Sequence, residues 1–213
     1  MKIRTTLFLL MLMALCSCSK APDYYVCAYV WPSCHDDSLA HRYLWPEGKG
    51  EWEVIEKGDP RFEGHYQPRQ PLWGHELDND PAVVEKWIKT ALEYGVNTFI
   101  YDWYWYDDRP FLENCLNDGF LKAPNNTKMK FYIMWANHNA YHTWDKRNSD
   151  DFNTYVWSGA VDRKQFEIIG KRWLTQYFTK ENYYKIGGKP VVSIYELYNF
   201  VMGLGGAEET IKA

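Results

Sequence analysis

The sequence contains few cysteines, and their spacing does not fit a metal site. Of the five cysteines, no two form a C-x-x-C pair, and none has a histidine at a spacing that suits zinc. We therefore expect no metal and no cofactor. Cys27 and Cys34 could pair in an exported protein, but buried free thiols are at least as good an interpretation.

Clusters of basic residues and phosphate-binding glycine motifs are also missing. The formal net charge is −4, and no basic cluster occurs after the first residues, so the electrostatic pattern of a nucleic-acid-binding protein is absent. No G-x-G-x-x-G motif follows the first predicted strand, which argues against a nucleotide-binding open sheet. We therefore do not expect nucleic acid as a partner.

Long apolar runs are absent except near the N-terminus, where the run from Leu7 to Leu15 is too short to span a bilayer. Basic residues precede it, as in a secretory signal. Leu15-Cys16-Ser17-Cys18 resembles a bacterial lipobox, so we predict a lipoprotein-type signal peptide at residues 1–17, lipidation of Cys18 and a tether at residues 18–23. The protein would then be exported and anchored by lipid in a bacterial envelope. An ordinary cleaved signal is the alternative.

Aromatic residues, in contrast, are abundant. They make up 18% of the chain, with 11 Trp and 17 Tyr. Trp and Tyr combine a flat face with a polar group, which suits the apolar faces and the hydroxyls of sugar rings. A core rich in Trp is the alternative.

Strand and helix patterns alternate along the chain. Apolar and β-branched runs predict strands at residues 24–30, 97–104, 130–136 and 191–195. Helices are predicted to begin at Pro81, at Pro110 and after Asp162, and a last helix-like stretch covers residues 207–213. The segments 31–79 and 138–159 are predicted to be loops.

Four strand-helix units with parallel crossovers are compatible with a (β/α)8 barrel or with an open doubly wound sheet. We expect an α/β fold of the (β/α)8 TIM-barrel type, truncated to about its first four units. Residues 24–213 would form the N-terminal half of a glycosidase-like barrel, because a complete barrel typically needs about 250 residues.

Polar residues lie where the predicted strands end, and in barrels these positions face the active site. Asp102 lies in the last part of the second strand, Asn137 and His138 follow the third, and Glu196 follows the fourth. Asp102 and Glu196 are the catalytic candidates, as a pair of glycosidase-type acids. Hydrogen bonding to sugar hydroxyls, a buried ion pair and a helix cap are the alternatives.

Aromatic and polar residues near these positions are candidates for substrate binding. Those at the strand ends are Trp103, Tyr104, Trp135, Asn137, His138 and Tyr195, and those in the long first loop are Glu51, His65 and Tyr66. Consecutive strand residues point to opposite sides, so Trp103, Tyr104 and Trp105 cannot all line one pocket. At least one of them is expected in the core.

Several strings together resemble the WbsX-type domain, described as glycosyltransferase WbsX or as glycoside hydrolase family 99-like. They are Gly48-Lys49-Gly50-Glu51-Trp52, Phe62-Glu63-Gly64-His65-Tyr66-Gln67-Pro68, the aromatic second strand, Phe131 to Asn139, and Gly188-Lys189-Pro190 leading into Ile194-Tyr195. The resemblance runs from about Tyr24 to the C-terminus.

The resemblance to family 99 implies a (β/α)8 barrel and a retaining, endo-acting mannosidase. Tyr195-Glu196-Leu197-Tyr198 loosely matches a Tyr-Asp-Ser-Tyr-like ending of the family's fourth strand, with Glu in place of Asp. The family's catalytic glutamates lie in an Asn-Glu-Trp-x-Glu-like motif, which this sequence lacks. The resemblance thus implies a sugar-binding face whose main acid and base are not in this chain.

We expect a glycoside hydrolase that acts on extracytoplasmic glycans. A WbsX-type glycosyltransferase in polysaccharide synthesis is a second hypothesis, although export separates it from cytoplasmic nucleotide sugars. A non-catalytic, lipid-anchored glycan-binding protein is the third.

Overall fold

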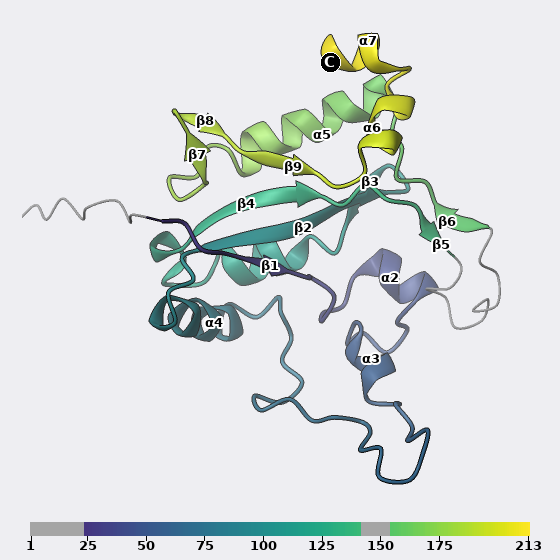
Figure 1. The fold of residues 1–213 in the computed structure, drawn as a ribbon, viewed down its shortest axis with the longest axis vertical. Helices are drawn as coiled ribbons and strands as arrows, with labels where there is room; N and C mark the ends of the chain where they lie inside the picture. The colour runs from purple at the N-terminus through teal and green to yellow at the C-terminus, as the bar shows by residue number, and fades with distance from the viewer. Residues whose placement is uncertain (1–23, 142–153) are drawn as a thin grey trace, which may run out of the picture.

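The computed structural model describes residues 24–141 and 154–213, and its centre is a parallel sheet (Figure 1). The strands β1 (Cys27–Val30), β2 (Thr98–Tyr106), β4 (Lys130–Trp135) and β9 (Val192–Ile194) lie in the order β1-β2-β4-β9. All three pairings between them are parallel. The α/β class and the four predicted strands are confirmed, whereas closure into a barrel and truncation after four units stay predictions.

Two longer helices and several short elements surround this sheet. The helices are α2 (Ser38–Tyr43), α3 (Trp52–Ile55), α4 (Pro81–Glu93), the π-helix η1 (Cys115–Phe120), the 3-10 helix η2 (Asn126–Lys128), α5 (Arg163–Gln176), α6 (Leu197–Gly203) and α7 (Ala207–Ile211). The smaller strands are β3 (Arg109–Phe111), β5 (Ala140–Tyr141), β6 (Tyr155–Trp157), β7 (Lys185–Ile186) and β8 (Lys189–Pro190). Among the helices described, none has the length and apolar content needed to cross a bilayer.

The two long helices begin where the sequence predicts. The Asp80 carboxylate accepts a hydrogen bond from the Ala82 amide, with Pro81 at the first helical position of α4. The Asp162 carboxylate accepts one from the Gln165 amide at the start of α5. These local caps explain why both starts were predictable.

The prediction of a helix that begins at Pro110 is wrong. Asp107 and Asp108 have positive φ values of 52° and 57°, and they turn β2 into the antiparallel β3. Asp tolerates this conformation better than most residues do. Pro110 consequently lies in a strand opposite Trp105, and the only helix in this region is η1.

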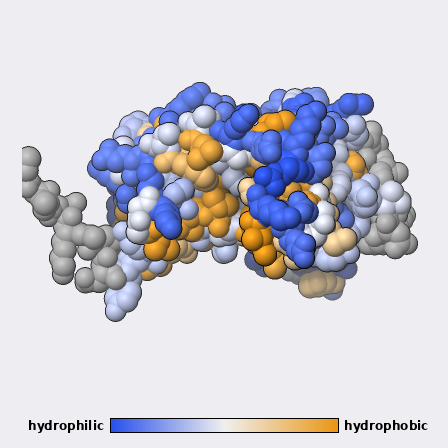
Figure 2. Space-filling view, turned by 90° about the horizontal axis from the view of Figure 1, so that it is seen from above, coloured by the Kyte–Doolittle hydropathy of each residue, from blue (hydrophilic) through white to orange (hydrophobic). Residues whose placement is uncertain are grey.

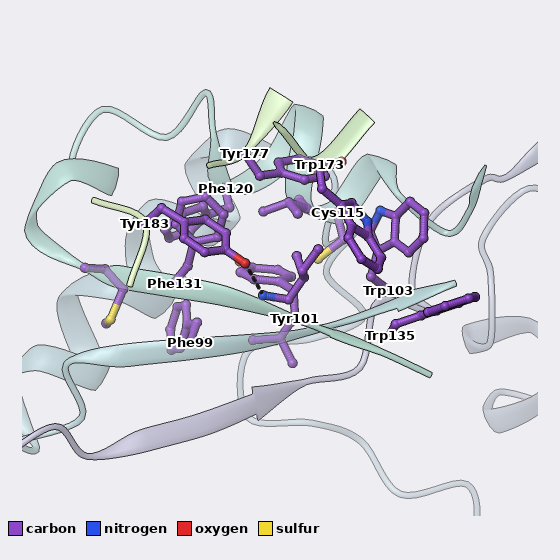
Figure 3. Packing of buried hydrophobic residues seen from close by; sticks show 14 of the residues in the cluster. Phe99, Tyr101, Trp103, Cys115, Phe120, Phe131, Trp135, Trp173, Tyr177 and Tyr183 are labelled. Atoms are coloured by element: carbon purple, nitrogen blue, oxygen red, sulfur yellow. Dashed lines mark hydrogen bonds between the residues drawn. The ribbon is translucent and has the colours of Figure 1, made fainter. Parts of the chain in front are cut away.

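Helices cover one face of the sheet. The core there contains Phe99, Tyr101 and Trp103 of β2 together with Phe131 and Trp135 of β4. Side chains of α4, η1 and α5 belong to the same cluster. Figure 3 shows these rings packed between the sheet and the helices, with the Tyr183 hydroxyl accepting a hydrogen bond of 3.3 Å from the Ile133 amide.

The opposite face is covered only in part. Ile100, Tyr104 and Tyr106 of β2 form a second cluster with Leu39 of α2 and Trp157 of β6. Because side chains alternate along a strand, the positions between Phe99, Tyr101 and Trp103 must face this second side. Asp102 therefore shares this side of β2 with Ile100, Tyr104 and Tyr106.

The surface over α5, α6 and α7 is not uniformly polar. Leu174, Leu197 and Met202 are each more than half exposed. Figure 2, which looks down on this side, shows hydrophobic residues gathered in patches among hydrophilic ones. The helices of this side thus have apolar side chains on both their inner and their outer surfaces.

A buried carboxylate joins the sheet to the helix layer. Glu113, which is 6% exposed, accepts hydrogen bonds from the Trp103 indole (2.8 Å), the Asn117 amide (2.9 Å) and the Tyr177 hydroxyl (2.5 Å). The Arg172 guanidinium adds two more, through Nε and Nη2. This ion pair therefore links β2, η1 and α5.

We predict that Glu113→Gln destabilises the fold by about 3 kcal/mol, because it leaves the Arg172 charge partly buried without its counter-charge. Urea unfolding at pH 7 measures the change. Glu167→Gln is the matched control, since Glu167 forms an exposed ion pair with Arg163 on α5, and its cost should stay within about 0.5 kcal/mol. Equal midpoints for the two variants would contradict this role of Glu113.

Candidate functional site

A row of aromatic rings follows the carboxyl ends of the sheet. Trp31, directly after β1, lies edge-on to Tyr104 of β2, with ring centroids 6.0 Å apart. Tyr104 lies 6.0 Å from the ring of His138, which follows β4. His138 lies 5.7 Å from Tyr195, which follows β9. All four strands therefore contribute one ring each to a continuous edge.

We define the rim as Trp31, Asp102, Tyr104, His138, Tyr195 and Glu196. A hollow of about 690 Å³ opens at one end of it. The hollow is lined by His138, Asn139, Tyr141, Tyr195, Glu196, Tyr198 and Asn199. Its size is within the range of small-molecule sites, and its lining combines hydroxyl, amide, imidazole and carboxylate groups.

Asp102 is the most unusual polar residue of the rim. It lies within β2, with Trp103 and Tyr101 on either side pointing into the helix-covered core. Burial raises the pKa of the Asp102 carboxyl from 3.8 to about 6, and the nearby Tyr104 hydroxyl opposes part of that rise. The carboxylate oxygen Oδ1 is buried without a hydrogen-bond partner among the described residues. Asp102 is therefore an acidic group whose hydrogen-bonding capacity the described residues leave unfilled.

Asn137 positions the end of β9 rather than facing the hollow. It is 1% exposed, and its side-chain amide donates to the Glu196 carbonyl while its oxygen accepts from the Glu196 amide, both at 2.8 Å. Both polar atoms of the Asn137 side chain are thereby used inside the protein. The expected contact between Asn137 and a ligand is not available in this structure.

Glu196 is the N-cap of α6. Its Oε1 accepts a hydrogen bond of 3.2 Å from the Tyr198 amide, which is one of the structural alternatives foreseen for it. The residue also lines the hollow beside Tyr195. The two hydrogen bonds between the Asn137 side chain and the Glu196 backbone fix the main chain here, and the cap orients the carboxylate. A catalytic role for Glu196 stays a prediction.

Two tryptophans predicted to bind substrate lie in the core instead. Trp103 is 1% exposed and Trp135 is fully buried, and Trp173 of α5 contacts both rings. Figure 3 shows both side chains within the packed interior. Since these positions of β2 and β4 point to the helix-covered face, neither indole can stack on a ligand at the rim. Tyr104, on the opposite face, is 1% exposed and contributes mainly its ring contacts.

The residues predicted from the first loop divide into two groups. Glu51 lies beside the rim, because its Oε2 accepts hydrogen bonds from the Trp31 indole (3.0 Å) and the Ser33 hydroxyl (2.7 Å). His65 instead stacks on Phe62 with ring centroids 4.6 Å apart, and Tyr66 beside it is exposed. Both lie in the loop between α3 and α4, which extends away from the sheet (Figure 1). The structure does not bring His65 and Tyr66 to the rim.

Trp31 was not among the predicted site residues. It comes directly after β1, so the rule that strand ends face the site could have found it. Cys18, predicted to carry lipid, lies outside the described residues. Within residues 24–141 and 154–213, no group of three or more His, Cys, Asp or Glu side chains has a geometry that could hold a metal ion.

The sheet and the rim define an α/β protein whose polar groups gather at the carboxyl edge of parallel strands. The chain belongs to the glycosyltransferase WbsX family, whose model matches residues 26–202, and so to a carbohydrate-active group. It is 28% identical over 153 residues to the uncharacterized protein WxcX of Xanthomonas campestris pv. campestris, in strains B100 and ATCC 33913. That match covers 71% of this chain and 21% of the relative, so the chain spans about a fifth of the relative's length.

Among the solved structures that match in part is the GH99 endo-alpha-mannosidase from Bacteroides thetaiotaomicron, with a TM-score of 0.42 and 16% sequence identity. The match covers 82% of this chain and 45% of that one.

The raised pKa of Asp102 predicts a specific pH dependence of stability. Because the folded protein binds this proton more tightly than the unfolded chain does, the wild type should lose stability as the pH rises from about 4 to about 6. Asp102→Asn removes the ionisation. The free energy of unfolding of the variant, relative to that of the wild type, should therefore increase across that range. The increase should be on the order of 1 kcal/mol after allowance for solvent screening.

Urea unfolding of both proteins between pH 4 and pH 8 checks this. A difference in the free energy of unfolding that stays constant with pH would mean that Asp102 ionises as it does in the unfolded chain.

Proposed function

We propose that this protein binds a glycan at the rim and takes part in hydrolysis of its glycosidic bonds. The observation that carries the proposal is Asp102, a carboxyl group whose pKa is raised to about 6 by burial and whose Oδ1 meets no hydrogen-bond partner in the part of the chain that the structure describes. Glycosidases use a carboxyl group with a raised pKa to protonate the leaving oxygen. Membership of a carbohydrate-active family supports the choice of ligand.

The other rim groups have complementary roles in this proposal. His138 and Tyr195 supply ring faces and polar atoms beside the hollow, and such groups match the C-H faces and hydroxyls of a sugar. Glu196, fixed by Asn137 and by α6, is the second carboxylate and accepts hydrogen bonds from sugar hydroxyls. Retaining glycosidases keep their two carboxyl groups about 5 Å apart and inverting ones about 6.5–9.5 Å apart, and a structure with bound glycan would assign the stereochemical course.

The description of the family favours a second candidate, glycosyl transfer. A transferase would use the same rim to hold an acceptor sugar, with Asp102 as the base that takes the proton of the attacking hydroxyl. Binding of a nucleotide sugar by the protein, without hydrolysis of any glycan, would favour this candidate over the hydrolase.

We predict that Asp102→Asn weakens glycan binding at least tenfold and abolishes any hydrolysis, because a charge-assisted hydrogen bond contributes about 1.5–3 kcal/mol. Calorimetry with manno- and gluco-oligosaccharides, together with release of reducing sugar, measures both effects. Asp107→Asn is the matched control, since Asp107 is exposed at the turn after β2 and Asn tolerates its positive φ. The proposal fails if the wild type binds none of these glycans, or if the two variants behave alike.

We also propose that residues 1–17 direct export and that Cys18 carries a lipid anchor. The lipobox-like string Leu15-Cys16-Ser17-Cys18 supports this, and a lipid anchor would hold the rim close to glycans outside the cytoplasm.

Expression of the full chain in a bacterium fed labelled palmitate should label the wild type and not the Cys18→Ser variant. Cys27→Ser is the control and should keep the label. Label retained in Cys18→Ser, or a wild-type protein that stays in the cytoplasm, would contradict the anchor.

A further inference from the structure

Four tryptophans from separate segments line a second pocket, away from the hollow at Tyr195. Trp31 follows β1, Trp52 begins α3, Trp73 lies in the loop before α4, and Trp87 belongs to α4. The pocket has a volume of about 270 Å³, and we name it the tryptophan pocket. The long segment between β1 and α4 thus brings together aromatic rings that are far apart in the sequence.

Most of the indole N-H groups of the tryptophan pocket are bonded inside the protein. The Trp31 indole donates to Glu51 at 3.0 Å. Trp52 donates to the Glu76 carbonyl at 2.7 Å, and Trp87 donates to the Glu76 carboxylate at 3.3 Å. These bonds fix the ring planes, so the rings are preorganised and need no reordering when a ligand binds.

The outer wall of the tryptophan pocket is exposed although it is apolar. Leu72 is 97% exposed and Trp73 is 44% exposed. The Lys86 ammonium lies 4.4 Å from the centre of the Trp73 ring, which holds that ring in place. An apolar, concave site of this kind is typical of small-molecule binding sites.

Trp31 connects the tryptophan pocket to the rim. The same indole lines the pocket and contacts the ring of Tyr104 at the rim, 6.0 Å away between centroids. A ligand that uses both places must be extended, with a flat apolar face in each unit and polar groups between the faces. A chain of sugar rings has this form, because each ring can place a C-H face against an indole.

We propose that the tryptophan pocket is a glycan subsite that holds a sugar unit one or more residues away from the unit at Asp102. The inference rests on the proposed function and adds to it the place where a second unit of the same sugar chain is held. Its recognition in this pocket comes from stacking on rings, whereas recognition at the rim comes from hydrogen bonds and charge.

Calorimetry with α-manno-oligosaccharides of one to four units tests this subsite. We expect the affinity of the wild type to rise at least tenfold between the single sugar and the longest chain. Trp73→Ala should remove most of that gain, a loss of roughly five- to tenfold, and leave binding of the single sugar unchanged. Leu72→Ala should reduce the gain in affinity with chain length. It should not lower the free energy of unfolding, because the Leu72 side chain is almost fully exposed.

Tyr94→Ala is the control, since Tyr94 is an exposed aromatic residue at the end of α4, and it should bind all lengths as the wild type does. Asp102→Asn should weaken every length by a similar factor. An affinity that does not depend on chain length, with rim binding intact, overturns the subsite and leaves the proposed function standing. If Trp73→Ala abolishes binding of the apolar dye ANS but changes no oligosaccharide affinity, the pocket serves an apolar partner and the subsite is wrong.

Discussion

The ion pair between Glu113 and Arg172 is the interaction on which the arrangement of the molecule depends. Charges are expensive to bury unless they are paired and fully hydrogen-bonded, and Glu113 meets that condition with five hydrogen bonds from four side chains. Its partners come from β2, η1 and α5. The helix layer is consequently held to one face of the sheet in a single orientation.

That constraint also determines which residues face the rim. The Trp103 indole donates to Glu113, so Trp103 must point into the helix layer, and the alternation of β2 then turns Asp102 and Tyr104 to the other side. The two carboxylates of this region therefore have opposite environments. Glu113 has its hydrogen-bonding capacity filled. Asp102 is half-buried, which raises its pKa, and its Oδ1 has no hydrogen-bond partner among the described residues. The first stabilises the fold, and the second is the group to which we assign the proposed chemistry.

The parts of the structure that sequence reasoning found are those with local signals. The caps at Asp80 and Asp162 act within three residues, and the continuous apolar run of β2 predicts a strand without reference to the rest of the chain. The period-two rule separated Trp103 from Tyr104, but it could not say which face the helices would cover, so Trp103 and Trp135 were assigned to the ligand. The role of Glu113 could not be predicted from the sequence, because its partners Arg172 and Tyr177 lie 59 and 64 residues away in the chain.

The long segment after β1 shows how a loop without a helical or strand pattern can still be fixed in place. Gly50, with a φ of 63°, comes so close to the residues that follow β1 that an added Cβ would lie 2.0 Å from the Ser33 carbonyl oxygen, so only glycine fits there. That approach brings the next residue, Glu51, within hydrogen-bonding distance of Ser33 and Trp31. Further along, Asp78 accepts from the Cys34 amide at 2.8 Å and lies 2.5 Å from His35. Both ends of the segment are therefore attached to the residues that follow β1. The close approach at Gly50 places Glu51 where it fixes the Trp31 indole, and Trp31 in turn joins the rim to the tryptophan pocket.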